Sequence, residues 1–270
     1  MIRDITLGQF FPGKSLLHRL DPRVKLLWVL VYIILLFLVN TALGFTLYVV
    51  ITAVLIKLSG IRVKMFFKGM RPIVFLLVFT AVINMFMTAG EPIFKLGFLS
   101  VTKEGIRIAV FMALRLMLLV TGTSLLTFTT SPIMLTDAIE RILSPFSKIG
   151  VPADAIAMMM TIAIRFIPTI LEETDKIIKA QKARGADFES GNILARAKAM
   201  TPILIPLFIS AFRRADELAV AMECRCYHGG EGRTRLKQLK ISKIDIESLC
   251  FIPVLLILVI FSRQFSLGLM

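Results

Sequence analysis

The chain has 270 residues, of which 57% are hydrophobic and 19% charged, and its mean hydropathy is +0.82. A soluble domain is only about half apolar, so this composition excludes one and indicates a protein of the lipid bilayer. The 32 Lys and Arg residues outnumber the 18 Asp and Glu residues, giving a net charge of +14. This positive charge must lie outside the hydrocarbon, facing anionic headgroups or an acidic partner.

Five segments are apolar over nearly 20 residues and are predicted to cross the membrane. They cover residues 24–40, 43–59, 72–89, 105–128 and 248–265. Basic residues precede the first segment and follow the second, whereas Asn40 and Thr41 between them carry no charge. The positive-inside rule therefore predicts a cytoplasmic N-terminus, in a multi-pass protein of the plasma membrane.

Two further apolar runs, 153–171 and 201–212, are predicted not to cross the membrane. If the first crossed outward alone, the basic residues from Lys176 to Lys198 would lie outside the cell, against the positive-inside rule. Both runs are instead expected to begin long amphipathic helices, about 153–184 and 202–228, that lie along the inner membrane surface. Each helix would be apolar at its start and charged at its end.

Local signals mark the boundaries of these helices. Ser131-Pro132 and Thr201-Pro202 each resemble a helix N-cap followed by a first-turn proline, and the first of them predicts a shorter helix at 132–143. Glycines follow both long helices. The expected fold is all-α, with about five transmembrane helices and a cytoplasmic-side coupling domain of long amphipathic helices. The expected domains are residues 1–128, 129–247 and 248–270.

The two long helices end in the same arrangement, an arginine between two small residues. The first end is Ala183-Arg184-Gly185 and the second is Cys224-Arg225-Cys226. The helix dipole favours an arginine in the last turn, and small neighbours let its planar guanidinium enter a narrow acidic groove. Either arginine alone could merely cap carbonyls or touch lipid phosphate. The pair predicts two docking sites, formed by Ala183, Arg184, Gly185, Cys224, Arg225 and Cys226.

Several longer motifs occur in order along the chain. They are HRLDPRVK at 18–25, TFTTSP at 127–132, RFIP at 165–168, QKARGAD at 181–187 and RRADELA at 213–219. In this series the chain resembles the transmembrane T component of energy-coupling factor (ECF) transporters, the EcfT/CbiQ family. The resemblance covers almost the whole chain.

The resemblance implies a set of partners and a division of labour. Two X-Arg-X motifs of that family insert into two ATP-binding cassette ATPase subunits, and they correspond to Arg184 and Arg225. A separate membrane-embedded S component binds the vitamin or metal ion, and the T component transmits ATP-driven motion to it. The second motif of the family more often has Ala and Gly flanks than the two cysteines found at 224 and 226.

The sequence holds no pattern of catalytic residues. It contains no G-x-x-x-x-G-K-[ST] phosphate-binding loop, so ATP and Mg²⁺ are expected in the partner ATPases, with no cofactor and no metal on this chain. His18 and His228 are far apart in the sequence and lack a carboxylate cluster. The chain is therefore not expected to be an enzyme, and no nucleic acid is expected as a partner.

Arg115 falls within the fourth predicted span, where an ionisable residue is a functional candidate. It could pair with backbone carbonyls or with Asn84 in the bundle, or it could contact substrate. The alternative function is a self-contained secondary transporter, which requires polar groups at mid-bilayer and paired broken helices. The first three spans offer little polarity beyond Asn84.

The apolar halves of the two long helices are predicted to form a platform for the S component. This platform comprises Ala155, Ala157, Met158, Met159, Ala163, Leu204 and Leu207. Within lipid, close packing and shape must supply affinity, so small residues would mark the nearest approach. The methionines could adapt to several partners or could simply fill a core.

Overall fold

The computed structural model describes residues 10–88, 92–96, 99–188, 192–229, 239 and 241–267. Helices dominate it, as the sequence predicts for an all-α membrane protein. The chain divides into two compact units, which are described here over these residues. The larger unit spans 8–135 and 239–270, and the smaller unit spans 136–238.

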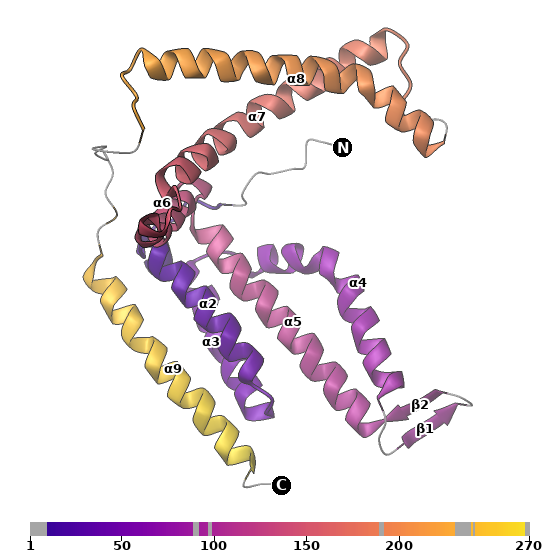
Figure 1. The fold of residues 1–270 in the computed structure, drawn as a ribbon. Helices are drawn as coiled ribbons and strands as arrows, with labels where there is room; N and C mark the ends of the chain where they lie inside the picture. The colour runs from indigo at the N-terminus through magenta and orange to yellow at the C-terminus, as the bar shows by residue number, and fades with distance from the viewer. Residues whose placement is uncertain are drawn as a thin grey trace. The chain divides into compact units, whose positions relative to one another are not determined.

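The larger unit is a helix bundle with one short hairpin (Figure 1). Its helices are α1 (Leu16–Arg19), α2 (Pro22–Leu38), α3 (Ala42–Ser59), α4 (Val63–Met87), α5 (Lys103–Thr129) and α9 (Lys243–Leu267). Strands β1 (Pro92–Leu96) and β2 (Leu99–Thr102) pair antiparallel, with Phe94 opposite Val101. This hairpin lies between the third and fourth predicted spans.

The core of the larger unit lies where α2, α3, α5 and α9 meet. Leu36 and Tyr48 are fully buried there, beside Leu118 of α5 and Leu255 of α9. The hydroxyl of Tyr32 lies 2.9 Å from the Thr52 hydroxyl and donates to the Leu118 carbonyl at 3.2 Å. A Cβ at position 122 would lie 2.5 Å from the Tyr32 ring, so Gly122 permits this approach of α2 to α5.

The outer surface of this bundle is apolar. Leu30, Phe75 and Ile257 are 59%, 78% and 63% exposed, as expected for side chains that lipid covers in place of water. By length and composition five described helices could cross a membrane, namely α3, α4, α5, α7 (Ala153–Ala183) and residues Lys243–Ser262 of α9. The chain is thus a multi-pass membrane protein.

The five helices are not the same five as the predicted spans. Helix α2 has 17 residues, about 25 Å at 1.5 Å per residue, which is slightly short of a hydrocarbon core of about 30 Å. Helix α7 is long and apolar enough to span a membrane because its first half holds only two charged residues, Asp154 and Arg165. Its second half holds six charged residues between Glu172 and Lys182. Its placement along the inner surface stays a prediction.

Two helices begin earlier than the sequence predicts. Helix α4 begins at Val63, nine residues before the predicted span, and contains Pro72 in its interior. Helix α8 (Ile193–Glu223) begins at Ile193, so Pro202 lies inside it and not in its first turn. A proline within a helix removes one backbone bond and bends the axis, and α4 is visibly bent (Figure 1). The expected N-cap role of Thr201 is therefore wrong.

The smaller unit contains most of α6 (Pro132–Leu143), the 3₁₀ segment η2 (Ser144–Ile149), α7 and α8. Helix α6 has the bounds predicted for it. The Ser131 hydroxyl accepts a hydrogen bond from the Met134 N–H at 3.3 Å, which satisfies one unpaired donor of the first turn. Helix α7 also begins and ends within one residue of its predicted bounds.

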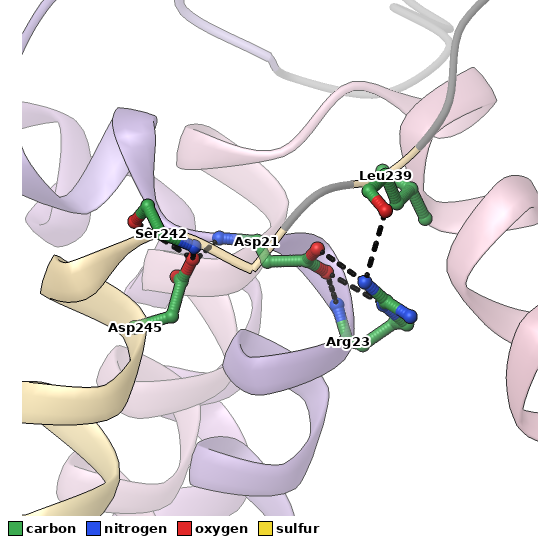
Figure 2. Close-up of polar contacts among 5 residues, drawn as sticks. All are labelled: Asp21, Arg23, Leu239, Ser242 and Asp245. Atoms are coloured by element: carbon green, nitrogen blue, oxygen red, sulfur yellow. Dashed lines mark hydrogen bonds and ion pairs between the residues drawn. The ribbon is translucent and has the colours of Figure 1, made fainter.

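Buried polar contacts join α2 to α9 at one end of the bundle (Figure 2). The Asp245 carboxylate, 1% exposed, accepts from the Asp21 N–H at 2.7 Å and from the N–H and hydroxyl of Ser242 at 2.7 and 2.8 Å. The Arg23 guanidinium donates to both carboxylate oxygens of Asp21 and also reaches the Leu239 carbonyl at 3.4 Å. The start of α2 is thereby fixed against the start of α9.

The two carboxylates of this group, Asp21 and Asp245, lie near two cations, Arg23 and Lys25. Burial alone would raise the pKa of the Asp21 carboxyl, but the hydrogen bonds and charge of Arg23 outweigh burial and hold that pKa below its usual value. Asp21 is therefore ionised at neutral pH. The buried Lys25 ammonium donates to the Thr129 carbonyl at 3.0 Å and to the Thr130 hydroxyl at 3.2 Å, which also ties α2 to the end of α5.

Candidate functional site: two arginine-capped helix ends

The first arginine lies in the turn that closes α7. Gly185 follows it in the left-handed conformation, with φ +86°. The Gly185 N–H donates to the Lys182 carbonyl and the Ala186 N–H to the Gln181 carbonyl, both at 3.0 Å. This pair of bonds is the Schellman motif, which satisfies the last carbonyls of a helix. Within it, Arg184 is the C-cap residue, and its side chain is exposed.

The second arginine lies in a turn closed by the same bonds. The Cys226 N–H donates to the Glu223 carbonyl at 2.9 Å and the Tyr227 N–H to the Met222 carbonyl at 3.1 Å. Cys226 takes the left-handed conformation here, with φ 55°. Arg225 therefore occupies the position in this turn that Arg184 occupies in the first, although regular α8 already ends at Glu223. Helix ends assigned in different ways commonly differ by a residue or two.

The two turns present their arginines alike. Arg184 and Arg225 are both exposed, as are Ala183, Gly185, Cys224 and Cys226 on either side of them. Neither guanidinium has a hydrogen bond or ion pair with the part of the chain that the structure describes. A planar group with five donors, free at a helix end and between small residues, can bind a carboxylate in bidentate fashion inside a partner's cleft.

Cys226 is the least suited residue in these turns, because a Cβ disfavours the left-handed conformation that glycine adopts freely. We expect Cys226→Gly to stabilise the turn by about 1 kcal/mol, seen as slower hydrogen exchange of the Tyr227 amide. Cys224→Gly is the matched control, because Cys224 has φ −61° and ψ −23°, in the right-handed region. Glycine should there cost about 1 kcal/mol and speed the exchange. Equal effects of both changes would contradict this account.

The predicted platform residues differ in accessibility. Ala155, Met159, Ala163 and Leu204 are exposed, and Met158 and Leu207 are partly buried. Ala157 is only 4% exposed, so it already packs within the chain and has little surface to offer a partner. Of the small residues in the predicted platform, Ala155 and Ala163 are the exposed ones.

Arg115 makes contacts within the bundle. Its guanidinium donates to the Val39 carbonyl at 2.6 Å and to the Asn40 side-chain oxygen at 2.9 Å, and it lies over the rings of Phe37 and Phe45. Of the predicted pairings, the one with a backbone carbonyl is thus present. Asn84 instead donates to the Thr80 carbonyl of its own helix. Arg115 thereby caps the end of α2, where the helix dipole favours a cation.

Sequence reasoning missed one polar contact between α7 and α8. The Ser210 hydroxyl donates to one carboxylate oxygen of Glu173, and the Arg214 guanidinium donates to the other at 2.8 Å. In the sequence, Arg214 belongs to the RRADELA motif at 213–219. The i, i+4 spacing of Ser210 and Arg214 places them on one face of a helix, but no local signal identifies Glu173 as their acceptor.

No group of three or more His, Cys, Asp and Glu side chains that could hold a metal ion occurs among the described residues. The described cysteines, Cys224, Cys226 and Cys250, are free thiols and exposed. The exposed guanidinium at each of the two helix ends is chemically suited to charge-assisted hydrogen bonds with an acidic group.

Comparison with known proteins agrees with this architecture. The family model of the cobalt transport protein CbiQ matches residues 13–236. An energy-coupling factor transporter transmembrane protein EcfT from Clostridium kluyveri is 59% identical over 266 residues, which cover 97% of this chain and 98% of that protein. The EcfT protein of Bacillus subtilis is 43% identical over 264 residues, covering 97% and 100%. The chain therefore belongs to the CbiQ family, as a transmembrane component of an energy-coupling factor transporter.

Proposed function

We propose that this chain is the coupling subunit of an importer, and that it transmits ATP-driven motion of two ATPase subunits to a substrate-binding S component. The vitamin or metal ion would be bound by the S component. ATP and Mg²⁺ would be bound by the ATPases, so this chain would carry no cofactor and perform no catalysis. The N-terminus and both arginine-capped ends would lie in the cytoplasm, where the ATPases are.

The observation that carries this proposal is the matched construction of the two helix ends. Arg184 and Arg225 lie at the same position of two Schellman turns, and both are exposed between small residues. Each of two identical or related ATPase subunits could then bind one of these ends in its cleft. A helix that ends in a lipid-facing or self-capping arginine has no need for a second copy of the same turn 41 residues later.

The alternative of a self-contained secondary transporter has less support. Such a protein needs polar groups that face a substrate within the bilayer. Arg115, the charged residue near the middle of the fourth predicted span, instead contacts Val39 and Asn40 of its own chain, and Asn84 bonds to its own helix. These contacts leave little polar chemistry for a substrate in the described bundle.

The source of energy distinguishes the two functions. In proteoliposomes that contain this chain with its partner subunits, uptake should require ATP and Mg²⁺ on the ATPase side and should survive ionophores that dissipate ion gradients. The chain reconstituted alone should transport nothing. Uptake by the chain alone, abolished by ionophores and indifferent to ATP, would instead establish the secondary transporter.

The platform gives a separate prediction. We expect Ala163→Trp to reduce capture of the S component about tenfold while leaving capture of the ATPases unchanged, because overpacking a close contact costs about 1–3 kcal/mol. Glu172→Trp, an exposed position in the charged half of the same helix, is the control and should affect neither. Affinity capture from detergent-solubilised membranes measures both. If Ala163→Trp leaves both captures intact, Ala163 faces lipid and the platform lies elsewhere.

A further inference from the structure

Helices α7 and α8 cross within the smaller unit (Figure 1), and the contact of Glu173 with Ser210 and Arg214 joins them. Both carboxylate oxygens of Glu173 are used, one by Ser210 and the other by Arg214. A carboxylate held at both oxygens by donors one turn apart on a single helix has its plane fixed relative to that helix. The contact therefore defines an orientation as well as a point of attachment.

Further contacts between the two helices lie on either side of this point. Towards the end of α7, Gln181 donates to the Pro202 carbonyl at 3.4 Å. Towards the start of α7, the helices enclose an open apolar groove lined by residues such as Ile162, Phe166, Ala215 and Met222. The helices thus run antiparallel, and Glu173 lies between these two regions of contact.

The crossing point is equally far from both docking ends. Arg184 follows Glu173 by 11 residues, and Arg225 follows Arg214 by 11 residues. At 1.5 Å per residue, each distance is about 16 Å along the helix. Because the helices are antiparallel, the two arginine ends point away from each other along the pair. The same length of helix therefore separates each arginine from the crossing point.

We propose, on the basis of the coupling function proposed above, that Glu173, Ser210 and Arg214 form the pivot of α7 and α8. The pivot holds the crossing while the two helix ends follow their ATPases, so that motion at Arg184 and motion at Arg225 become one coordinated change of angle. These three are positioning residues, since they touch neither ATP nor substrate.

A purely stabilising role does not explain the arrangement. The side chains of Glu173 and Arg214 are 25% and 33% exposed, and ion pairs this exposed contribute little to stability, typically about 0–1 kcal/mol. What such a pair can supply is a preferred geometry between the two helices that it joins. The expected effect of its loss is therefore on the angle between the helices and only weakly on folding.

Distances between spin labels near the two ends test the pivot in the complete chain, in lipid nanodiscs. Labels attached through a ketone-bearing unnatural amino acid in place of Lys179 and Val220, each five residues before an arginine, leave the native cysteines unchanged and should give one narrow distance distribution. Glu173→Gln and Arg214→Ala should each broaden it at least twofold. The adjacent exposed residues supply matched controls, Glu172→Gln and Arg213→Ala, which should leave it unchanged. The charge exchange Glu173→Arg with Arg214→Glu should restore a narrow distribution.

Adding the ATPases, then ATP with Mg²⁺, separates this proposal from the coupling function itself. The parent labelled chain should show a shift in the label distance on ATP addition, whereas Glu173→Gln should still capture the ATPases but show no uniform shift. If the Glu173 and Arg214 variants keep the narrow distribution, the pivot is wrong whatever the chain couples. If Glu173→Gln loses the ATPases, the contact serves docking and the pivot is again wrong. If the parent chain captures no ATPase, the proposed function fails instead.

Discussion

Replacing both Arg184 and Arg225 with alanine should abolish capture of the ATPases by the tagged chain. Each change removes a charge-assisted contact that, once buried in a partner's cleft, is worth about 2–5 kcal/mol, or at least tenfold in affinity. Each single variant should lose one ATPase subunit and keep the other, since the two ends are built alike but lie apart. Quantitative capture from solubilised membranes, with the tagged chain as the reference, measures both effects.

The controls must separate this effect from a general loss of positive charge. Lys179→Ala and Arg213→Ala remove an exposed basic residue from the same two helices, outside the terminal turns. Both variants should capture the ATPases at the level of the unmodified chain. Undiminished capture by the double alanine variant, or an equal loss in the lysine and arginine controls, would show that the helix ends do not dock the ATPases.

Replacing Asp245 with alanine should destabilise the larger unit by about 3–5 kcal/mol, the usual cost of removing one partner from a buried charged group of contacts. The Asp21 N–H and the Ser242 N–H would lose their acceptor (Figure 2), and the charges of Arg23 and Lys25 would lose one of two nearby carboxylates. Thermal unfolding in detergent, followed by the loss of helix signal, should show a lower midpoint.

A neighbouring acidic residue makes this prediction specific. Glu247 lies two residues further along α9 and is exposed, so Glu247→Ala should change stability by less than about 0.5 kcal/mol. Asp245→Asn keeps the shape of the side chain and one acceptor oxygen, so its unfolding midpoint should fall between those of Asp245→Ala and Glu247→Ala. Equal midpoints for Asp245→Ala and Glu247→Ala would mean that the link between α2 and α9 contributes nothing to the fold.

The sequence predicts a helix well where local chemistry decides its ends. Ser131 and Pro132 mark the start of α6, and Gly185 provides the left-handed residue that ends α7. The start of α8 was missed because Thr201-Pro202 looks like an N-cap. The preceding residues from Ile193 to Met200 include several strong helix formers, and their combined propensity outweighs the one backbone bond that Pro202 removes.

The candidate site divides in the same way. Arg184 and Arg225 could be found from the sequence because an arginine between small residues at a helix end is a local pattern. The left-handed conformation of Cys226 could not be predicted from the sequence, since glycine is the residue expected at such a position. Glu173 was missed because its contact depends on where two helices cross, which neither helix encodes alone. The sequence identifies Arg115 as a candidate, but its partners Val39 and Asn40 depend on where α2 ends.

The composition of the complex tests the central claim most directly. The tagged chain, solubilised from membranes of its own host in mild detergent, should bring down two ATP-binding cassette ATPase subunits and one small membrane protein in fixed ratio to itself. Native mass spectrometry of the eluted complex gives that ratio. A chain that elutes alone from such membranes and transports substrate when reconstituted without partners would contradict the coupling function.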